Sequence, residues 1–443
     1  MRDAVGVSLL SSLTASEASI ADPEGTAVPV CENNSQAPPT IHRDLIAQTI
    51  VNSVKQKGSE SYRRSYNKWS SMALDNIRHA LAASSLPTKP DADATAQLGF
   101  ELGVAADYGA MPSFADGGAR AGYALDYFCR VKLLGDVLFG ERMMRWQRQE
   151  NEQQQSPSYL GDTINDLLCS PNQEVCRIGS LGGGPGFDHV AAVVLATHVA
   201  LEREVQKCID TKAPASLDLN DEEDDSLPRI EMEDVLTHLS TRTRPSIPRI
   251  ETTVYEYEAG WDDIIPHMDR STQSVLDLST RHSCSFAGCD ITVPLSHSAN
   301  AECMKNAQTT DLWICSYCVA ENAIRLRAKD YVFFVELFDA AKEGAVFIFT
   351  ETTHRLWPEI IDLATKTSGS IELIASGFDV TFPRIQQGRG KAGFQLALRK
   401  RAGATLGEDV QTTCERFRRD NAMHEIKMSG GYKRQKRKIP GAK

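Results

Sequence analysis

The stretch that decides the fold is Cys176-Arg177-Ile178-Gly179-Ser180-Leu181-Gly182-Gly183-Gly184-Pro185-Gly186-Phe187-Asp188. A short apolar strand runs into a glycine-rich turn, and an Ala/Val-rich helix follows. The glycines at 182, 184 and 186 lack the Cβ atoms that would hold a ligand away, and they allow the positive φ angles of a tight strand-to-helix turn. The helix then presents free N–H groups to a carboxylate or phosphate. The stretch therefore predicts a nucleotide-cofactor loop, with an ordinary βα turn as the alternative.

The spacing of these glycines separates two kinds of cofactor loop. Dinucleotide dehydrogenases favour G-x-G-x-x-G, which would need a glycine where Phe187 stands. The run from Leu181 to Gly186 instead resembles the first motif of class I S-adenosylmethionine-dependent methyltransferases, acid-x-Gly-x-Gly-x-Gly, often with Pro before the last glycine. The resemblance implies that S-adenosylmethionine is the cofactor and that these residues bind it: Ser180, Gly182, Gly183, Gly184, Gly186 and Phe187. The sequence departs from the motif at Ser180, where the family carries an acid that helps to hold the methionyl amino group.

Composition sets the broad class of protein. The 443 residues are 41% hydrophobic and carry a net charge of −11, and the mean hydropathy is −0.32. These values are typical of a globular protein, and no apolar run approaches the roughly 20 residues of a membrane helix. The odd number of cysteines, 11, favours reduced thiols over a disulfide framework, so we expect a cytoplasmic or nuclear protein.

Changes in composition predict the domain organisation. We expect a disordered leader over 1–40, a helical accessory or cap domain over 41–150, a methyltransferase domain over 151–402 and a basic tail over 403–443. Within the helical domain, the Gly-, Ala- and Asp-rich segment Asp91–Gly122 is expected to loop between helices. The acidic, proline-containing segment 210–248 is too long for an αβ loop and is expected to be an exposed insertion.

Beyond residue 170 the pattern alternates between strand and helix, which predicts an α/β fold. Strands are expected at Val175–Leu181, Thr252–Tyr257, Ser285–Thr292, Asp311–Tyr317, Ala345–Phe349, Ile371–Ala375 and Phe394–Leu398, with helices at Phe187–Ile209 and Tyr331–Lys342. Together with the resemblance, they predict a seven-stranded, doubly wound, Rossmann-like methyltransferase sheet preceded by the helical domain. Ligands of such sheets bind outside the carboxyl ends of the strands.

Acidic residues fall at those carboxyl ends. The resemblance implies that Glu256 or Glu258, after the second strand, accepts hydrogen bonds from both ribose hydroxyls; we favour Glu256 because it lies inside the β-rich run. It also implies that Asp290 and Ile291 meet the adenine amino group and ring, with a plain turn aspartate as the alternative. Trp261 is either an aromatic lid over the cofactor or, in our preferred interpretation, a buried residue at a helix start.

Methyl acceptors of the family bind after the fourth strand, which here reads Asp311-Leu312-Trp313-Ile314-Cys315-Ser316-Tyr317-Cys318-Val319-Ala320-Glu321-Asn322. We expect Tyr317, Glu321 and Asn322 to orient or deprotonate the acceptor, with helix-start structure as the alternative, and Cys315 to contact the cofactor. Cys315 and Cys318 form C-x-x-C, but a zinc site is disfavoured because one thiol would have to leave a buried strand end. His297 and His354 are expected at the surface rather than in the acceptor site.

The acceptor itself is named by no motif. RNA is the leading candidate, because two basic groups could neutralise its phosphates: Lys433–Lys438 and the Arg-Lys-Arg at 399–401. The group in the tail is alternatively a nuclear localisation signal. The acidic net charge favours a small-molecule or protein acceptor instead. A non-catalytic relative that uses the fold as a binding module is the third alternative, because of the missing acid at Ser180.

Overall fold

A computed structural model describes much of the chain. The described residues are 60–108, 111–132, 134–135, 137–138, 160–170, 172–212, 247–276, 282–351, 356–364, 367, 371–376, 386–387, 391–392, 394–403, 415 and 418–419. The predicted leader, the polar segment Gln149–Pro157, His354, the basic run Lys433–Lys438 and nearly all of the acidic insertion lie outside these residues. Within them, no helix combines the length and the apolar character that a membrane crossing requires.

The elements follow one another as predicted from residue 170 onward. The helices are α2 (Glu60–Ala83), α3 (Ala92–Tyr108), α4 (Gly117–Asp126), α6 (Leu160–Cys169), α7 (Phe187–Lys212), α9 (Ile265–Leu276), α10 (Ala301–Asn306), α11 (Ala323–Ala328), α12 (Val332–Ala340) and α13 (Trp357–Ala364), with 3-10 turns η1 (Ala259–Asp263) and η2 (Ser298–Asn300). The strands are β1 (Val175–Leu181), β2 (Arg249–Glu256), β3 (Ser283–Gly288), β4 (Leu312–Ser316), β5 (Val346–Glu351), β6 (Ile371–Ser376), β7 (Gln386–Gln387), β8 (Lys391–Ala392) and β9 (Phe394–Lys400).

The seven-stranded, doubly wound sheet predicted from the sequence is confirmed. Its order is β3-β2-β1-β4-β5-β9-β6, and β9 runs antiparallel to both of its neighbours. The strand order reverses between β1 and β4, which is the topological switch point where doubly wound folds bind their ligands. The third strand ends at Gly288, two residues before the expected Asp290, so Asp290 lies in the following loop rather than on the strand.

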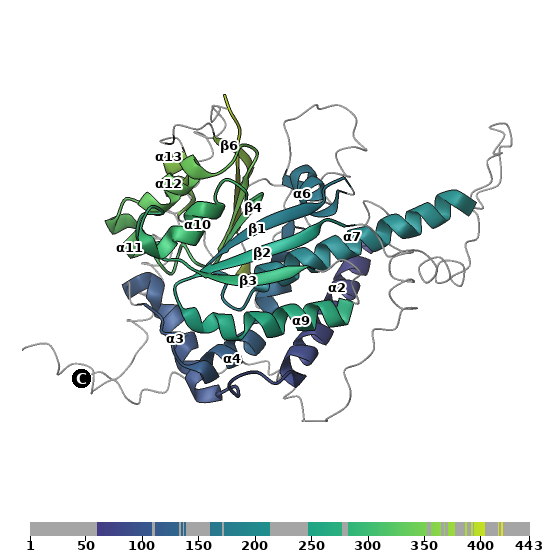
Figure 1. Cartoon of the computed structure of the whole chain (residues 1–443), viewed down its shortest axis with the longest axis horizontal. Helices are drawn as coiled ribbons and strands as arrows, with labels where there is room; N and C mark the ends of the chain where they lie inside the picture. The colour runs from purple at the N-terminus through teal and green to yellow at the C-terminus, as the bar shows by residue number, and fades with distance from the viewer. Residues whose placement is uncertain are drawn as a thin grey trace, which may run out of the picture. The chain divides into compact units, whose positions relative to one another are not determined.

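Side-chain alternation along the strands builds two apolar cores. Ile314 and Ile348 face a core shared with α2, α4, α7 and α9, whereas Trp313 and Phe347 face a second core shared with α10, α12 and α13. Figure 1 shows these two groups of helices on opposite sides of the sheet. The central strands are buried on both faces, as the continuous apolar run Leu312–Cys315 indicates.

The amino-terminal helices share the first of these cores. Tyr66, Trp69 and Ile77 of α2 are buried, and α2 packs against α7 and α9. Helices therefore lie where the sequence predicts an accessory domain, and their division into a separate domain stays a prediction.

The loop expected over Asp91–Gly122 is wrong, because the segment forms α3 and the start of α4. The Asp91 carboxylate caps α3 by accepting a hydrogen bond from the Ala94 amide at 2.9 Å. A Cβ at Gly122 would lie 1.8 Å from Oγ1 of Thr95. The small residues of this segment therefore allow α3 and α4 to approach closely, where the sequence analysis took them for helix breakers.

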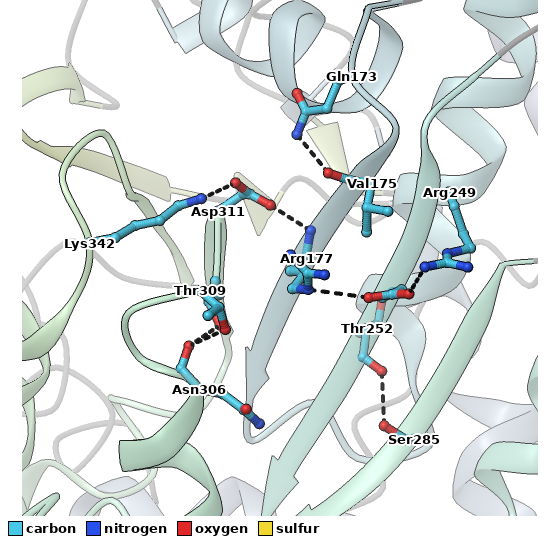
Figure 2. A network of polar contacts seen from close by, with 12 residues as sticks. Gln173, Val175, Arg177, Arg249, Thr252, Ser285, Asn306, Thr309, Asp311 and Lys342 are labelled. Atoms are coloured by element: carbon cyan, nitrogen blue, oxygen red, sulfur yellow. Dashed lines mark hydrogen bonds and ion pairs between the residues drawn. The ribbon is translucent and has the colours of Figure 1, made fainter.

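A polar network joins the amino ends of the central strands, at the edge opposite the switch-point loops. Asp311 accepts a hydrogen bond from the Arg177 amide at 2.7 Å and pairs with Lys342. Glu251 pairs with the guanidinium groups of Arg249 at 2.6 Å and Arg177 at 3.3 Å (Figure 2). These contacts link β1 with β2, β4 and the segment before β5, and they fix the strands whose other ends build the site.

Candidate functional site

A cleft opens at the carboxyl ends of β1, β2 and β4. Its lining joins the glycine loop, the residues that follow each strand, and the amino-terminal helical segment: Met111, Pro112, Phe114, Tyr123, Arg130, Gly182, Gly184, Tyr255, Glu256, Tyr257, Trp261, Cys289, Asp290, Ile291, Ser316, Tyr317, Cys318, Glu321 and Asn322. The cleft therefore lies at the topological switch point, where the sequence predicts the ligand.

The glycine loop adopts the geometry that its sequence predicts. Gly182, Gly184 and Gly186 have φ angles of 66°, 53° and 91°, which other residues rarely adopt. A Cβ at Gly182 would lie 2.5 Å from the Cys318 sulfur. A Cβ at Gly184 would face the rings of Tyr123 and Trp261 at 3.8 Å across the cleft. Glycine at 184 thus leaves the space between the loop and these two rings free of a side chain.

An acid from the next helix bonds Ser180, the residue that stands where the motif acid is missing. Asp188, in the first turn of α7, accepts hydrogen bonds from the hydroxyl groups of Ser180 at 2.7 Å and Ser316 at 3.0 Å. Burial raises the pKa of Asp188 to about 6. The carboxylate fixes the ends of β1 and β4 side by side, and Ser316 carries this contact to the wall of the cleft.

The two glutamates after β2 have different roles. Glu256 lines the cleft, its side chain accepts a hydrogen bond from the Tyr257 amide at 3.1 Å, and burial raises its pKa to about 7. Glu258 instead caps η1 by accepting from the Gly260 amide at 3.2 Å. The strand ends at Glu256, so the alternation that would place both on one face stops there. Of the two glutamates, Glu256 is the one that lines the cleft, and its ribose-binding role stays a prediction.

Asp290 and Ile291 line the cleft from the loop after β3. The Asp290 carboxylate accepts hydrogen bonds from the Thr292 amide at 2.8 Å and from its hydroxyl at 2.7 Å. The fully buried Asn300 braces the same loop, since its side chain accepts from the Asp290 amide at 2.7 Å and donates to the Pro294 carbonyl at 2.9 Å. Asp290 is therefore a turn-forming residue that also borders the cleft, which combines both sequence interpretations.

The segment after β4 brings together the three residues expected at the acceptor. Tyr317 has a φ angle of 60°, a left-handed conformation that is unfavourable outside glycine and often marks functional sites. Tyr317, Glu321 and Asn322 all line the cleft. The Asn322 side chain donates to the Cys318 carbonyl at 2.9 Å, so this residue also closes the turn.

Two carboxyl groups, the half-buried Glu321 and the buried Glu351, support this segment. Burial raises the pKa of Glu321 to about 7, although the nearby Arg130 guanidinium lowers it. Glu351, at the end of β5, accepts from the Ala320 amide at 2.9 Å, and burial raises its pKa to about 8. A carboxyl group with a pKa near neutrality is suited to accept a proton during a reaction.

The amino-terminal segment contributes one wall of the cleft. The guanidinium carbon of Arg130 lies 4.8 Å from the ring centre of Tyr317, 5.3 Å from that of Tyr127 and 5.5 Å from that of Tyr123. Arg130 also donates to the Tyr123 hydroxyl at 2.5 Å and lies 4.0 Å from the Glu321 carboxylate. The sequence analysis missed these residues because Tyr123 and Tyr127 belong to an apolar helical stripe that reads as core.

A short strap crosses the same wall. The Tyr257 hydroxyl donates to the Pro112 carbonyl at 2.5 Å, and the Ser113 amide donates to the Glu101 carboxylate at 3.0 Å. The Arg120 guanidinium holds the Phe114 carbonyl at 2.6 Å. Residues 111–116, here called the strap, are thus tied both to the amino-terminal helices and to the loop after β2.

Not every predicted residue lines the cleft. Ser180 and Cys315 are buried in the sheet, Phe187 packs on Tyr123 with ring centres 6.0 Å apart, and Gly183 and Gly186 lie within the loop backbone. Cys318 borders the cleft where Cys315 was expected, because Cys315, one residue before the end of β4, faces the second core. Trp261 is fully buried, as in the preferred interpretation of the sequence, and it also borders the cleft.

The described cysteines and histidines are of the residue types that bind metal ions. Among the described residues, no group of three His, Cys, Asp or Glu side chains is placed to hold an ion. The hydrogen bond with Cys315 and burial hold the pKa of the Cys318 thiol well above its usual value, so a reactive thiolate is not supported there. His297 is exposed and caps η2, as expected of a surface residue.

Comparisons with known proteins give structural but not sequence matches. No protein-family model and no curated protein matches the sequence. Solved structures that the chain is similar to include an S-adenosylmethionine-dependent methyltransferase from Methanosarcina mazei (TM-score 0.29, 10% identity, 52% of this chain and 94% of that one) and a class I enzyme described as a methyltransferase from Listeria monocytogenes (0.29, 9%, 76% and 90%). Human N-acetylserotonin methyltransferase in complex with S-adenosylmethionine is another (0.25, 10%, 81% and 93%). Similarity at this level adds no weight to what the chain's own strand order and glycine loop show.

Those two features give the protein the fold of class I S-adenosylmethionine-dependent methyltransferases. The side chains of the cleft suit that cofactor chemically. Gly184 carries no side chain that would fill the cleft, Glu256 offers acceptors to a diol, and the carboxyl groups of Glu256, Asp290 and Glu321 in the lining suit a positively charged ligand.

Proposed function

We propose that this protein is a methyltransferase that binds S-adenosylmethionine in the cleft and transfers its methyl group to an acceptor beside Tyr317 and Glu321. The single observation that carries the proposal is the cleft itself, in which the glycine loop after β1, Glu256 after β2 and the strained Tyr317 after β4 meet at the topological switch point. When bound, the cofactor supplies a methyl group activated by a positively charged sulfur.

The residues of the cleft divide the work between binding and proton transfer. Glu256 accepts hydrogen bonds from the ribose hydroxyl groups, and Ile291 covers one side of the adenine. Tyr317 and Asn322 orient the acceptor, since alignment is the main requirement of an in-line displacement. Glu321 takes the proton that the acceptor atom loses, for which its pKa near 7 is suited. The strap and Trp261 exclude water from the reacting atoms.

The charges of the cleft bear on the acceptor. Its lining holds three carboxyl groups, Glu256, Asp290 and Glu321, and the exposed side chains of Met111 and Tyr257 add apolar surface at its edge. Carboxylates repel phosphate groups, so this lining supports a small uncharged or cationic acceptor.

RNA as the acceptor finds less support. Arg399, the first residue of the Arg-Lys-Arg group, pairs with Glu372 at 2.7 Å, and the Lys400 ammonium group donates to the Asp339 carbonyl at 2.6 Å. Both cations therefore already have partners within the chain. The basic tail lies outside the described residues, so RNA stays a prediction, and a salt-dependent RNA affinity lost on deleting 427–443 would support it.

Calorimetric titration of the full chain with S-adenosylmethionine, with NAD as control, tests the proposed function. We expect micromolar binding of S-adenosylmethionine alone, and its loss in Gly184→Arg, because the new side chain would fill the space before Tyr123 and Trp261. Gly288→Arg is the matched control, since a Cβ there meets nothing within 4 Å. Absence of binding by the wild type would overturn the proposal and favour a non-catalytic binding module. Binding of S-adenosylmethionine without methyl transfer to any class of acceptor would overturn the proposal that the protein is an enzyme.

A further inference from the structure

Arg130 is a charged residue in an unusual place. Among the described residues it is the one cation that lines the cleft, and it comes from the helical turn after α4 rather than from the sheet. Its side chain is 22% exposed. Burying a guanidinium group is costly unless a carboxylate and several hydrogen bonds compensate it. A guanidinium group at this wall therefore has a desolvation cost that an apolar side chain of similar size would not have.

The partners that surround Arg130 compensate its charge only in part. Tyr123 accepts one hydrogen bond, and the faces of three tyrosine rings attract the cation weakly. The Glu321 carboxylate lies 4.0 Å away, beyond hydrogen-bonding distance. A guanidinium group has five N–H donors arranged as a planar fork that matches a carboxylate. The side of Arg130 toward the cleft is thus suited to an additional anionic partner.

The position of Arg130 along the cleft defines which part of a ligand it would meet. Glu256 and Asp290 follow β2 and β3, at one end of the cleft, where the proposed function places the ribose and adenine. Tyr317 and Glu321 follow β4, at the other end, and Arg130 lies next to both of them, over the Tyr317 ring and 4.0 Å from the Glu321 carboxylate. The amino-acid end of S-adenosylmethionine would then point toward β4. That end carries the cofactor's one anionic group, the methionyl carboxylate.

We propose that Arg130 binds the carboxylate of the cofactor's amino-acid end, so that the amino-terminal helical segment completes the cofactor site. The inference rests on the proposed function. It assigns Arg130 to recognition of the cofactor rather than of the acceptor. It also explains why three tyrosine rings surround this guanidinium group, since they hold it in place at the wall: Tyr123, Tyr127 and Tyr317.

Ligands that differ only in the carboxylate provide the test. Calorimetry of the full chain would compare S-adenosylhomocysteine with its decarboxylated analogue, for the wild type, Arg130→Ala and Arg130→Lys. We expect Arg130→Ala to weaken S-adenosylhomocysteine binding about 10- to 100-fold, the worth of hydrogen bonds between charged groups. Binding of the decarboxylated analogue should change less than about threefold, because that ligand never had the contact. Arg130→Lys keeps the charge but not the fork, so its loss should be smaller.

Controls separate this inference from a structural role and from failure of the proposed function. Lys305→Ala removes a positive charge from α10, where Lys305 is exposed and pairs with Glu302 at 3.1 Å away from the cleft lining, and should leave both affinities unchanged. Equal weakening of both ligands by Arg130→Ala and Arg130→Lys, in variants with wild-type melting temperatures, would overturn the role of Arg130. A wild type that binds neither ligand would overturn the proposed function itself, and the inference with it.

Discussion

Replacement of Glu256 by Gln tests the cofactor site through its pH dependence. Burial raises the pKa of this carboxyl group to about 7, so it is largely protonated at pH 5.5 and ionised at pH 8.5. A ribose diol donates its hydrogen bonds best to the ionised form. The apparent affinity of a ligand falls in proportion to the fraction of protein in the competent state. With a pKa of about 7, that fraction drops from nearly one to about 0.03, so S-adenosylhomocysteine should bind roughly 30-fold more weakly at pH 5.5 than at pH 8.5.

Glu258 provides the matched control because it lies two residues away and caps η1 instead of lining the cleft. We expect Glu256→Gln to lose most of the pH dependence and to bind at least about 30-fold more weakly at pH 8.5, because its neutral side chain resembles the protonated carboxyl group. Glu258→Gln should keep the full dependence. Glu321→Gln is measured alongside, because burial also raises that pKa to about 7. Calorimetry across the pH range decides the matter: a wild-type pH dependence that survives in Glu256→Gln and disappears in Glu258→Gln would refute the assignment of the ribose ligand.

Three further predictions concern the supports of the site. Burial raises the pKa of Asp188 from 3.8 to about 6, so the folded state binds the proton more tightly than the unfolded state. The free energy of unfolding of the wild type therefore falls as the pH rises through this range. In urea denaturation, the free energy of unfolding of Asp188→Asn should gain about 3 kcal/mol relative to that of the wild type between pH 4 and pH 7. Tyr257→Phe removes the hydrogen bond to the strap, and stopped-flow measurements should show S-adenosylhomocysteine dissociating about fivefold faster, whereas an unchanged rate would show that the strap does not cover the ligand. Gly179→Ala places a methyl group 2.4 Å from the Trp313 ring and should lower the free energy of unfolding by about 1–3 kcal/mol, against little change for Gly288→Ala, which has open space around it.

The parallel sheet could be predicted because its signals are local. Strand β1 lies at Val175–Leu181 as predicted, and the positive φ angles of the glycine loop follow from residue types that tolerate them. Buried parallel strands give continuous apolar runs such as Leu312–Cys315, which are readable without knowledge of their neighbours. Strand ends were less certain, since Asp290 lies beyond its strand.

The amino-terminal wall could not be predicted because its signals are tertiary. Tyr123, Tyr127 and Val131 repeat at a helical spacing that indicates burial, and Tyr123 and Val131 are buried, but the sequence does not say that this segment borders the cleft. Gly122 indicates a turn when read alone, although here it admits the Thr95 side chain between two helices. Arg130 has no sequence signal beyond a lone charge within an apolar stripe.

Ser180 shows how a departure from a motif can be compensated in three dimensions. The acid expected at that position would project from the end of β1, and Asp188 reaches the same place from the first turn of α7, since its carboxylate bonds both Ser180 and Ser316. A negative charge at the amino end of α7 is favoured by the helix dipole, which offsets part of the cost of burial. The serine hydroxyl groups donate to the carboxylate, so their oxygen atoms are left as acceptors, and Ser316 presents its oxygen at the cleft wall. The end of β4 therefore offers a hydrogen-bond acceptor to the cleft although the motif acid is missing from the end of β1.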